Sequence, residues 1–173
     1  FVAAWTVFVY APVAHWVFDF SQGEHVGGWL ANRLGLIDFA GGTAVEVCSG
    51  ASALALALVL GRRVGFGRDP MRPHNLTLVM LGAGLLWFGW FGFNAGSALT
   101  AGHTAAVVFV TTLLAGAAGA LGWLAVERFR DGHATSLGAA SGMVAGLVAI
   151  TPSCASLTPV GSLAMGALAG VIC

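Results

Sequence analysis

The chain is predicted to fold as an all-α, polytopic bundle of transmembrane helices. Of its 173 residues, 58% are hydrophobic and only 8% are charged, whereas soluble domains carry about 25% charged residues. The apolar residues gather in long runs, and the run at residues 39–60 is long enough to cross a bilayer as a helix. Run length favours helices, because membrane strands need only about ten alternating residues.

Six apolar segments are expected to form the spans of one partial membrane domain at residues 1–173. Their limits lie at about residues 1–18, 39–60, 76–99, 103–126, 136–151 and 160–173. The fifth is expected to end at Thr151-Pro152, because proline cannot continue a helix. The first and last segments are short and no methionine starts the chain, so we expect an internal piece of a longer protein.

The arginines predict the orientation in the membrane. Six of the seven lie in alternate loops, namely Arg62, Arg63, Arg68, Arg72, Arg128 and Arg130. Positively charged loops stay in the cytoplasm, so residues 19–37 are expected to lie outside. Arg62 and Arg63 also fit a contact with lipid headgroups. The net charge of zero indicates no nucleic-acid partner.

Glu46 is the most informative residue, because no other charge lies in the run at residues 39–60. A charge in mid-membrane costs about 3 kcal/mol on insertion scales. Glu46 therefore faces a cavity, a partner or a transported ion, or it is protonated and bonded to a neighbouring helix. Its helical face is small and partly polar, which keeps it away from lipid in both cases. That face consists of Gly42, Thr43, Ser49, Gly50 and Ala53.

Asp38 precedes the same span and is expected to be its N-cap. A carboxylate there satisfies free backbone N–H groups and the helix dipole. A second possible role is to add negative potential to an outer vestibule that attracts cations.

The third segment carries Trp90, Phe93 and Ser97 on one face. Aromatic faces attract cations by about 0.5–2 kcal/mol each, so a hydroxyl beside them favours a small-cation site. An aromatic stripe is more often part of a packed core or an aromatic belt than of a ligand site. Two glycine stripes predict close helix contacts: Gly89, Gly92 and Gly96 in this segment, and Gly138, Gly142 and Gly146 in the fifth.

Nothing in the sequence indicates a metal site, a cofactor or an enzyme. The cysteines at positions 48, 154 and 173 are scattered, and the five histidines are isolated, without the spacing of metal ligands. The glycine-rich stretches match no nucleotide-binding motif.

Three stretches, residues 38–45, 73–97 and 138–152, resemble motifs of the ammonium transporter family (Amt/Mep/Rh). The resemblance covers essentially the whole chain, and the middle stretch is long and specific. It implies an eleven-helix fold of two inverted five-helix repeats and a final helix, assembled as a homotrimer in the cell membrane with one pore per subunit. This chain would hold helices four to nine.

The resemblance also implies residue roles. Phe93 matches a gate phenylalanine below the outer vestibule, and Ser97 matches the serine that recruits ammonium. Asp38 matches an aspartate that supports that site indirectly, and Trp90 matches a tryptophan that lines the pore.

Two positions depart from the family pattern. Phe18 stands where members usually carry a vestibule tryptophan, and phenylalanine is the weaker cation–π partner. Glu46 stands at the first of two pore histidines, a position where some members also carry an acid.

The expected function is transport of ammonium or ammonia, with cation recruitment outside, a phenylalanine gate and deprotonation before passage. The alternative is an ammonium sensor whose membrane module is coupled to a signalling partner; a gas channel of the Rhesus branch is a third possibility. Partners implied by the resemblance are ammonium, the lipid bilayer, two further subunits and a cytoplasmic PII-type regulator.

Overall fold

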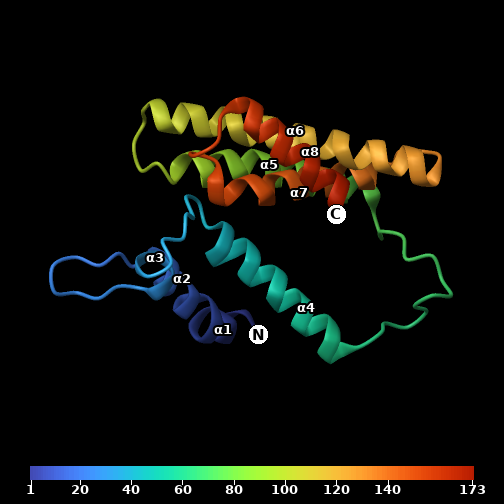
Figure 1. Cartoon of the computed structure of the whole chain (residues 1–173). Helices are drawn as coiled ribbons and strands as arrows, with labels where there is room; N and C mark the ends of the chain where they lie inside the picture. Colours follow the sequence, from blue (N-terminus) through green and yellow to red (C-terminus); the bar gives the residue numbers. More distant parts are fainter. The chain divides into compact units, whose positions relative to one another are not determined.

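The computed structural model describes all of residues 1–173 and confirms the all-α class. Helices and loops make up the chain, with a single isolated β-bridge between Gln22 and His25. The chain divides into two compact units, Phe1–Arg72 and Pro73–Cys173 (Figure 1). Four helices are long and apolar enough to cross a membrane.

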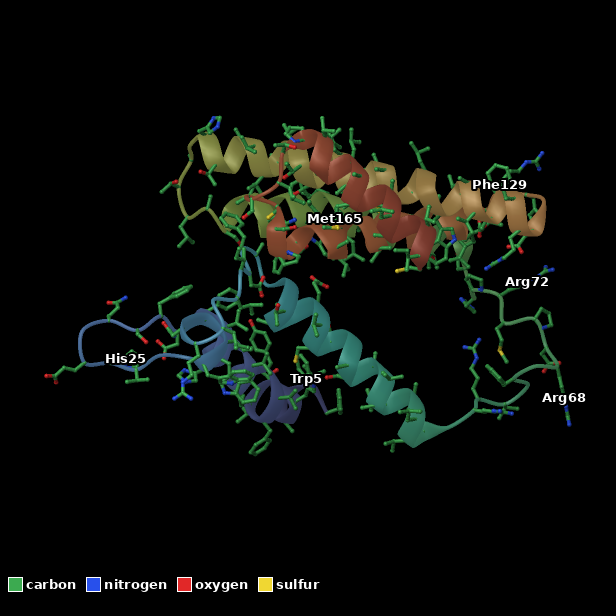
Figure 2. The ribbon with its side chains drawn as sticks, viewed as in Figure 1. Trp5, His25, Arg68, Arg72, Phe129 and Met165 are labelled. Atoms are coloured by element: carbon green, nitrogen blue, oxygen red, sulfur yellow. The ribbon has the colours of Figure 1, made fainter.

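The first unit contains two long helical stretches and one short helix. Its elements are α1 (Val2–Trp5), a π-helical turn (Thr6–Tyr10), α2 (Ala11–Phe18), α3 (Trp29–Asn32), a second π-helical turn (Gly42–Val47) and α4 (Cys48–Leu60). The indole Nε1 of Trp5 donates a 2.8 Å hydrogen bond to Ser52 Oγ, which ties the first stretch to α4. The arginine-rich loop after α4 extends away from it, as Arg68 and Arg72 show in Figure 2.

The second unit is a bundle of four helices. They are α5 (Leu76–Gly96), α6 (His103–Asp131), α7 (Ser136–Ile150), which continues into a 3-10 turn (Thr151–Ser153), and α8 (Pro159–Ile172). α6 packs against the other three (Figure 1). Side chains of Asn75, Thr135 and Thr158 accept hydrogen bonds from the first turns of α5, α7 and α8, as capping residues do.

α6 continues past the expected limit of the fourth span, near residue 126, to Asp131. Hydropathy detects the part of a helix that suits lipid, whereas Glu127, Arg128 and Arg130 are polar and still favour helix. The helix ends at Gly132, whose φ of 79° is left-handed and suits glycine.

Glycines bring the backbones of α6, α7 and α8 into direct contact. A Cβ added at Gly119 of α6 would lie 2.9 Å from the Cα of Gly146 in α7, and one added at Gly170 of α8 would lie 2.9 Å from the carbonyl carbon of Gly119. A Cβ at Gly142 would lie 3.1 Å from the Cα of Ala120. The close packing predicted for the glycines of the fifth segment is therefore confirmed.

The close packing predicted for Gly89, Gly92 and Gly96 of α5 is wrong within this chain. A Cβ at any of them would meet no atom within 4 Å, and all three line an open groove with Phe88 and Phe109. The reason is that α5 packs through another face, where Ala83, Trp87 and Trp90 meet α7.

Replacing Gly146 with alanine is expected to lower the free energy of unfolding by about 1–3 kcal/mol, because the new methyl group would overlap the α6 backbone. Thermal unfolding of the detergent-solubilised protein measures it. Gly84→Ala is the control, because a Cβ at Gly84 meets nothing within 4 Å in this chain. Equal stability of the two variants would contradict the backbone contact.

Candidate functional site

The candidate residues occur in both units. Phe18, Asp38 and Glu46 belong to the first unit, and Trp90, Phe93 and Ser97 belong to the second.

Asp38 receives four backbone hydrogen bonds at the start of the helix that carries Glu46. Its Oδ1 accepts from the amides of Gly41 at 2.9 Å and Gly42 at 2.6 Å. Its Oδ2 accepts from Thr43 at 2.7 Å and Ala44 at 3.2 Å. One carboxylate thus satisfies amides that the helix itself leaves without partners.

The expectation that Asp38 is the N-cap residue needs a correction. The N-cap is Gly41, whose φ of 95° is left-handed, and the helix begins at Gly42. This turn, which glycine adopts without strain, folds the chain so that the carboxylate of Asp38 reaches the helix end from three residues further back. The carboxylate satisfies free N–H groups of the helix as predicted, but from a different position.

Glu46 lies in a π-helical turn. The carbonyl of Gly41 accepts from the amide of Val45 at 2.7 Å and from the amide of Glu46 at 3.2 Å, so the turn is one residue wider than an α-turn. Such turns are frequent at functional sites. The Glu46 side chain is partly buried, and its carboxylate makes no hydrogen bond within the chain.

The small face around Glu46 is buried at Gly42 but open beyond Glu46 in this chain. Ser49, Gly50 and Ala53 are exposed, and the hydroxyl of Ser49 donates to the backbone carbonyls of Val45 and Glu46 rather than to the carboxylate. The interpretation of Glu46 as a group bonded to a neighbouring helix therefore finds no partner among these residues.

Trp90, Phe93 and Ser97 of α5 form one connected group. The rings of Trp90 and Phe93 meet edge to face with centroids 6.2 Å apart, and Ser97 Oγ donates to the carbonyl of Phe93 at 2.8 Å. Trp90 Nε1 donates to Thr151 Oγ1 at 2.9 Å, and Thr151 in turn donates to the carbonyl of Leu147 at 2.6 Å. The indole is therefore held in place, whereas Phe93 is 40% exposed.

Sequence reasoning missed two polar residues beside this group. Thr151, which holds Trp90, is completely buried, as is Asn94. Asn94 donates to Thr112 Oγ1 at 3.1 Å, and its Oδ1 has no partner. The available signal was a polar side chain inside an apolar helix, where unpaired polar groups are costly.

Phe18 is the last residue of α2 and is 39% exposed. The next residue, Asp19, accepts from His15 Nδ1 at 3.1 Å and from His25 Nε2 at 3.0 Å. His15 and His25 thus meet at one carboxylate, a contact that their separation in the sequence does not indicate. Asn32 Nδ2 donates to the carbonyl of Asp19 at 2.9 Å and closes the loop that brings His25 back.

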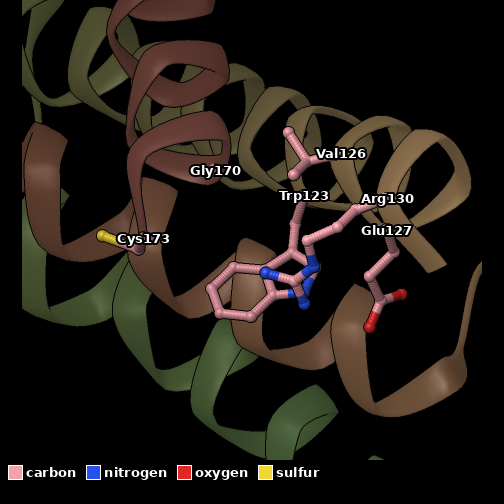
Figure 3. Close-up of a pocket in the computed structure, with 6 residues that line it drawn as sticks. All are labelled: Trp123, Val126, Glu127, Arg130, Gly170 and Cys173. Carbon is pink, nitrogen blue, oxygen red and sulfur yellow. The ribbon is translucent and has the colours of Figure 1, made fainter.

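The second unit has a small, partly open pocket between α6 and the end of α8. Its volume is about 30 Å³. Figure 3 shows its lining: Trp123, Val126, Glu127, Arg130, Gly170 and Cys173. Glu127 has a structural role there, because its carboxylate accepts from the Thr135 amide at 2.8 Å and joins α6 to the start of α7.

Comparisons with known proteins agree on one family. The model of the Ammonium Transporter Family matches residues 1–173. The chain is 63% identical to an ammonium transporter of Mycobacterium tuberculosis over 175 residues, covering 100% of this chain and 36% of that protein. It is 52% identical to one of Corynebacterium glutamicum over 174 residues, covering 99% and 38%.

Solved structures of the same family share the fold. The Mep2 structure of Saccharomyces cerevisiae matches with a TM-score of 0.85 at 40% identity, covering 96% of this chain and 37% of that one. The structure of a protein described as Sensor Amt Protein matches with a TM-score of 0.89 at 32% identity, covering 98% and 43%. The chain spans little more than a third of the relatives' length.

Replacing Asp38 with asparagine is expected to lower the free energy of unfolding by about 2–3 kcal/mol, because a neutral amide replaces a charged acceptor of four N–H groups. Hydrogen exchange of the amides at residues 41–44 should become faster, which mass spectrometry measures. Asp131→Asn is the control, because that carboxylate is exposed and bonds only to its neighbour Arg130. Unchanged exchange at residues 41–44 would contradict the role of Asp38.

Proposed function

Because the chain belongs to the ammonium transporter family, we propose that it forms part of a pore that carries ammonium or ammonia across the cell membrane. The chain is a multi-pass membrane protein with four helices of membrane-spanning length. The observation that carries the proposal is the connected group of Trp90, Phe93 and Ser97, which offers two aromatic faces and a hydroxyl on one helix.

Recruitment of the ion depends on acceptors, because ammonium offers only N–H donors. Ser97 uses its own proton in the bond to the Phe93 carbonyl, so its lone pairs remain to accept from the cation. Phe18 adds an aromatic face in the vestibule, which attracts the ion less strongly than a tryptophan would. Asp38 does not contact the ion; it acts indirectly, by holding the start of the helix that carries Glu46.

The gate is Phe93. Trp90 cannot turn freely because Thr151 holds its indole nitrogen, whereas Phe93 has no polar group to restrain its ring. Phe93 can therefore rotate against a fixed partner. A closed ring excludes water, and loss of hydration makes the charged ion costly relative to neutral ammonia. Deprotonation at the gate lowers that cost.

Glu46 accepts the proton or stabilises the cation within the pore. It takes the place of a pore histidine, and its carboxylate has no hydrogen bond within the chain to occupy it. As a carboxylate it attracts a cation, and as a neutral acid it can donate a proton. A histidine alternates between acceptor and donor in a comparable way.

A sensor is the second candidate, because Sensor Amt Protein has a similar fold at 32% identity. The transporters of Mycobacterium tuberculosis and Corynebacterium glutamicum are more similar in sequence, at 63% and 52%. Assembly as a homotrimer and contact with a PII-type regulator on the cytoplasmic side are part of the same proposal. A sensor would signal to its partner without moving ammonium, which uptake assays distinguish.

Ser97→Leu is expected to reduce methylammonium uptake at least tenfold, because it removes the acceptor, and Phe93→Ala is expected to make the pore less selective. Phe18→Trp should lower the concentration for half-maximal uptake about two- to fivefold, given a gain of about 0.5–1 kcal/mol. Radiolabelled uptake by cells expressing the full-length protein measures all three. Phe129→Ala is the control, because Phe129 is 90% exposed and lies away from the group. Normal uptake and affinity in the first two variants would rule out these roles.

Glu46→Gln keeps the shape of the side chain but removes its ionisable proton. We expect it to change the current, its pH dependence or the selectivity for ammonium over potassium, and we expect Glu46→His to approach the behaviour of members with two pore histidines. Electrophysiology of the full-length protein across a pH series measures this. Identical currents and selectivity in the parent, Gln and His forms would end the proposed role of Glu46 in the pore.

A further inference from the structure

The loop at residues 61–72 is the most concentrated positive charge in the chain. It follows α4 directly and carries Arg62, Arg63, Arg68 and Arg72 against a single carboxylate, Asp69. None of the four arginines forms an ion pair within the chain. The carboxylate of Asp69 instead lies over Gly65, close to where a Cβ of residue 65 would be. The backbone amide of Asp69 donates to the Gly65 carbonyl at 2.9 Å. The guanidinium groups are therefore free to bind an anion.

The same loop also exposes three apolar side chains. Val64 is 99% exposed, Phe66 is 60% exposed and Met71 is 40% exposed. The guanidinium carbon of Arg62 lies 5.6 Å from the centroid of the Phe66 ring. A charged group stacked on an exposed ring suits the boundary between headgroups and acyl chains, where aromatic and cationic groups occur together.

The other arginine cluster, Arg128 and Arg130, differs because both side chains have partners within the chain. Arg130 Nε lies 3.0 Å from Asp131 Oδ1, and Arg128 donates to the carbonyl of Gly132. Its cations are already engaged by groups of the chain. Only the loop after α4 therefore presents arginines that form no ion pair within the chain.

We propose that residues 61–72 bind the headgroups of anionic phospholipids at the cytoplasmic face, with Val64 and Phe66 inserted at the membrane interface. Juxtamembrane clusters of four or more arginines bind anionic lipid in this way. The loop is joined to a membrane-length helix, Gly42–Leu60, so a lipid headgroup is the anion available beside it. The proposed lipid binding goes beyond the proposed transport function. It rests on that function only for the orientation of the chain in the membrane.

Native mass spectrometry of the full-length protein in detergent tests the proposal, with phosphatidylglycerol and phosphatidylcholine of the same acyl chains as probes. We expect phosphatidylglycerol to bind more tightly, and each arginine removed to weaken it by about fivefold at low salt. The variants are the double changes Arg62→Gln with Arg63→Gln, and Arg68→Gln with Arg72→Gln. The matched control is Arg128→Gln with Arg130→Gln, which should bind the lipid as the parent does.

A second measurement reports insertion. A polarity-sensitive dye on Val64→Cys, in a protein with Cys48, Cys154 and Cys173 changed to alanine, should shift to the blue in phosphatidylglycerol nanodiscs and not in phosphatidylcholine ones.

Parental lipid affinity in both loop variants, or an equal loss in the control pair, would overturn the proposal. So would an unshifted dye, or displacement of the lipid by millimolar inorganic phosphate. If the loop instead binds an acidic protein, the variants and the parent would have the same lipid affinity, which would also overturn the proposal. Because binding is measured on purified protein, failure of transport has no bearing on the outcome.

Discussion

Direct contact between the backbones of α6, α7 and α8 is the constraint on which the second unit depends. Helices in a membrane gain little from hydrophobic burial against each other, so van der Waals contact must hold them. Gly119, Gly146 and Gly170 allow that contact, since a side chain at any of them would overlap a neighbouring helix. The position of α7 fixed in this way also fixes Thr151 at its end, and Thr151 orients Trp90.

Polar groups within these apolar helices show where the structure is rigid. Thr111 donates to the carbonyl of Cys154 at 2.8 Å, and the hydroxyl of Thr151 is bonded on both sides. Bonds of this kind are retained because no water competes for them. Phe93 lacks such a bond and is the exposed member of the aromatic pair. The proposed gate is thus an exposed ring in contact with a ring that a hydrogen bond holds in place.

The first unit uses charge where the second uses glycine. Asp38 holds the start of a helix by four hydrogen bonds, and Asp19 holds the loop after α2 through two histidines. Both carboxylates are engaged. The carboxylate of Glu46, which lies within a membrane-length helix, has no hydrogen bond within the chain. A costly group retained without a local partner is typical of a functional position in a membrane protein, and that contrast supports its place in the proposed pore.

Composition and run length sufficed to predict the helical membrane fold, because the bilayer restricts a spanning chain to helices or closed barrels. Residue spacing also placed Trp90, Phe93 and Ser97 together, since three- and four-residue intervals define a helical face. Contacts between segments were not predictable in this way. Thr151 meets Trp90 across 61 positions, and only helix packing decides that pairing. The left-handed turn at Gly41, the shared bonds of Asp19 and the open side of the α5 glycines likewise depend on the path of the backbone, which local sequence patterns do not specify.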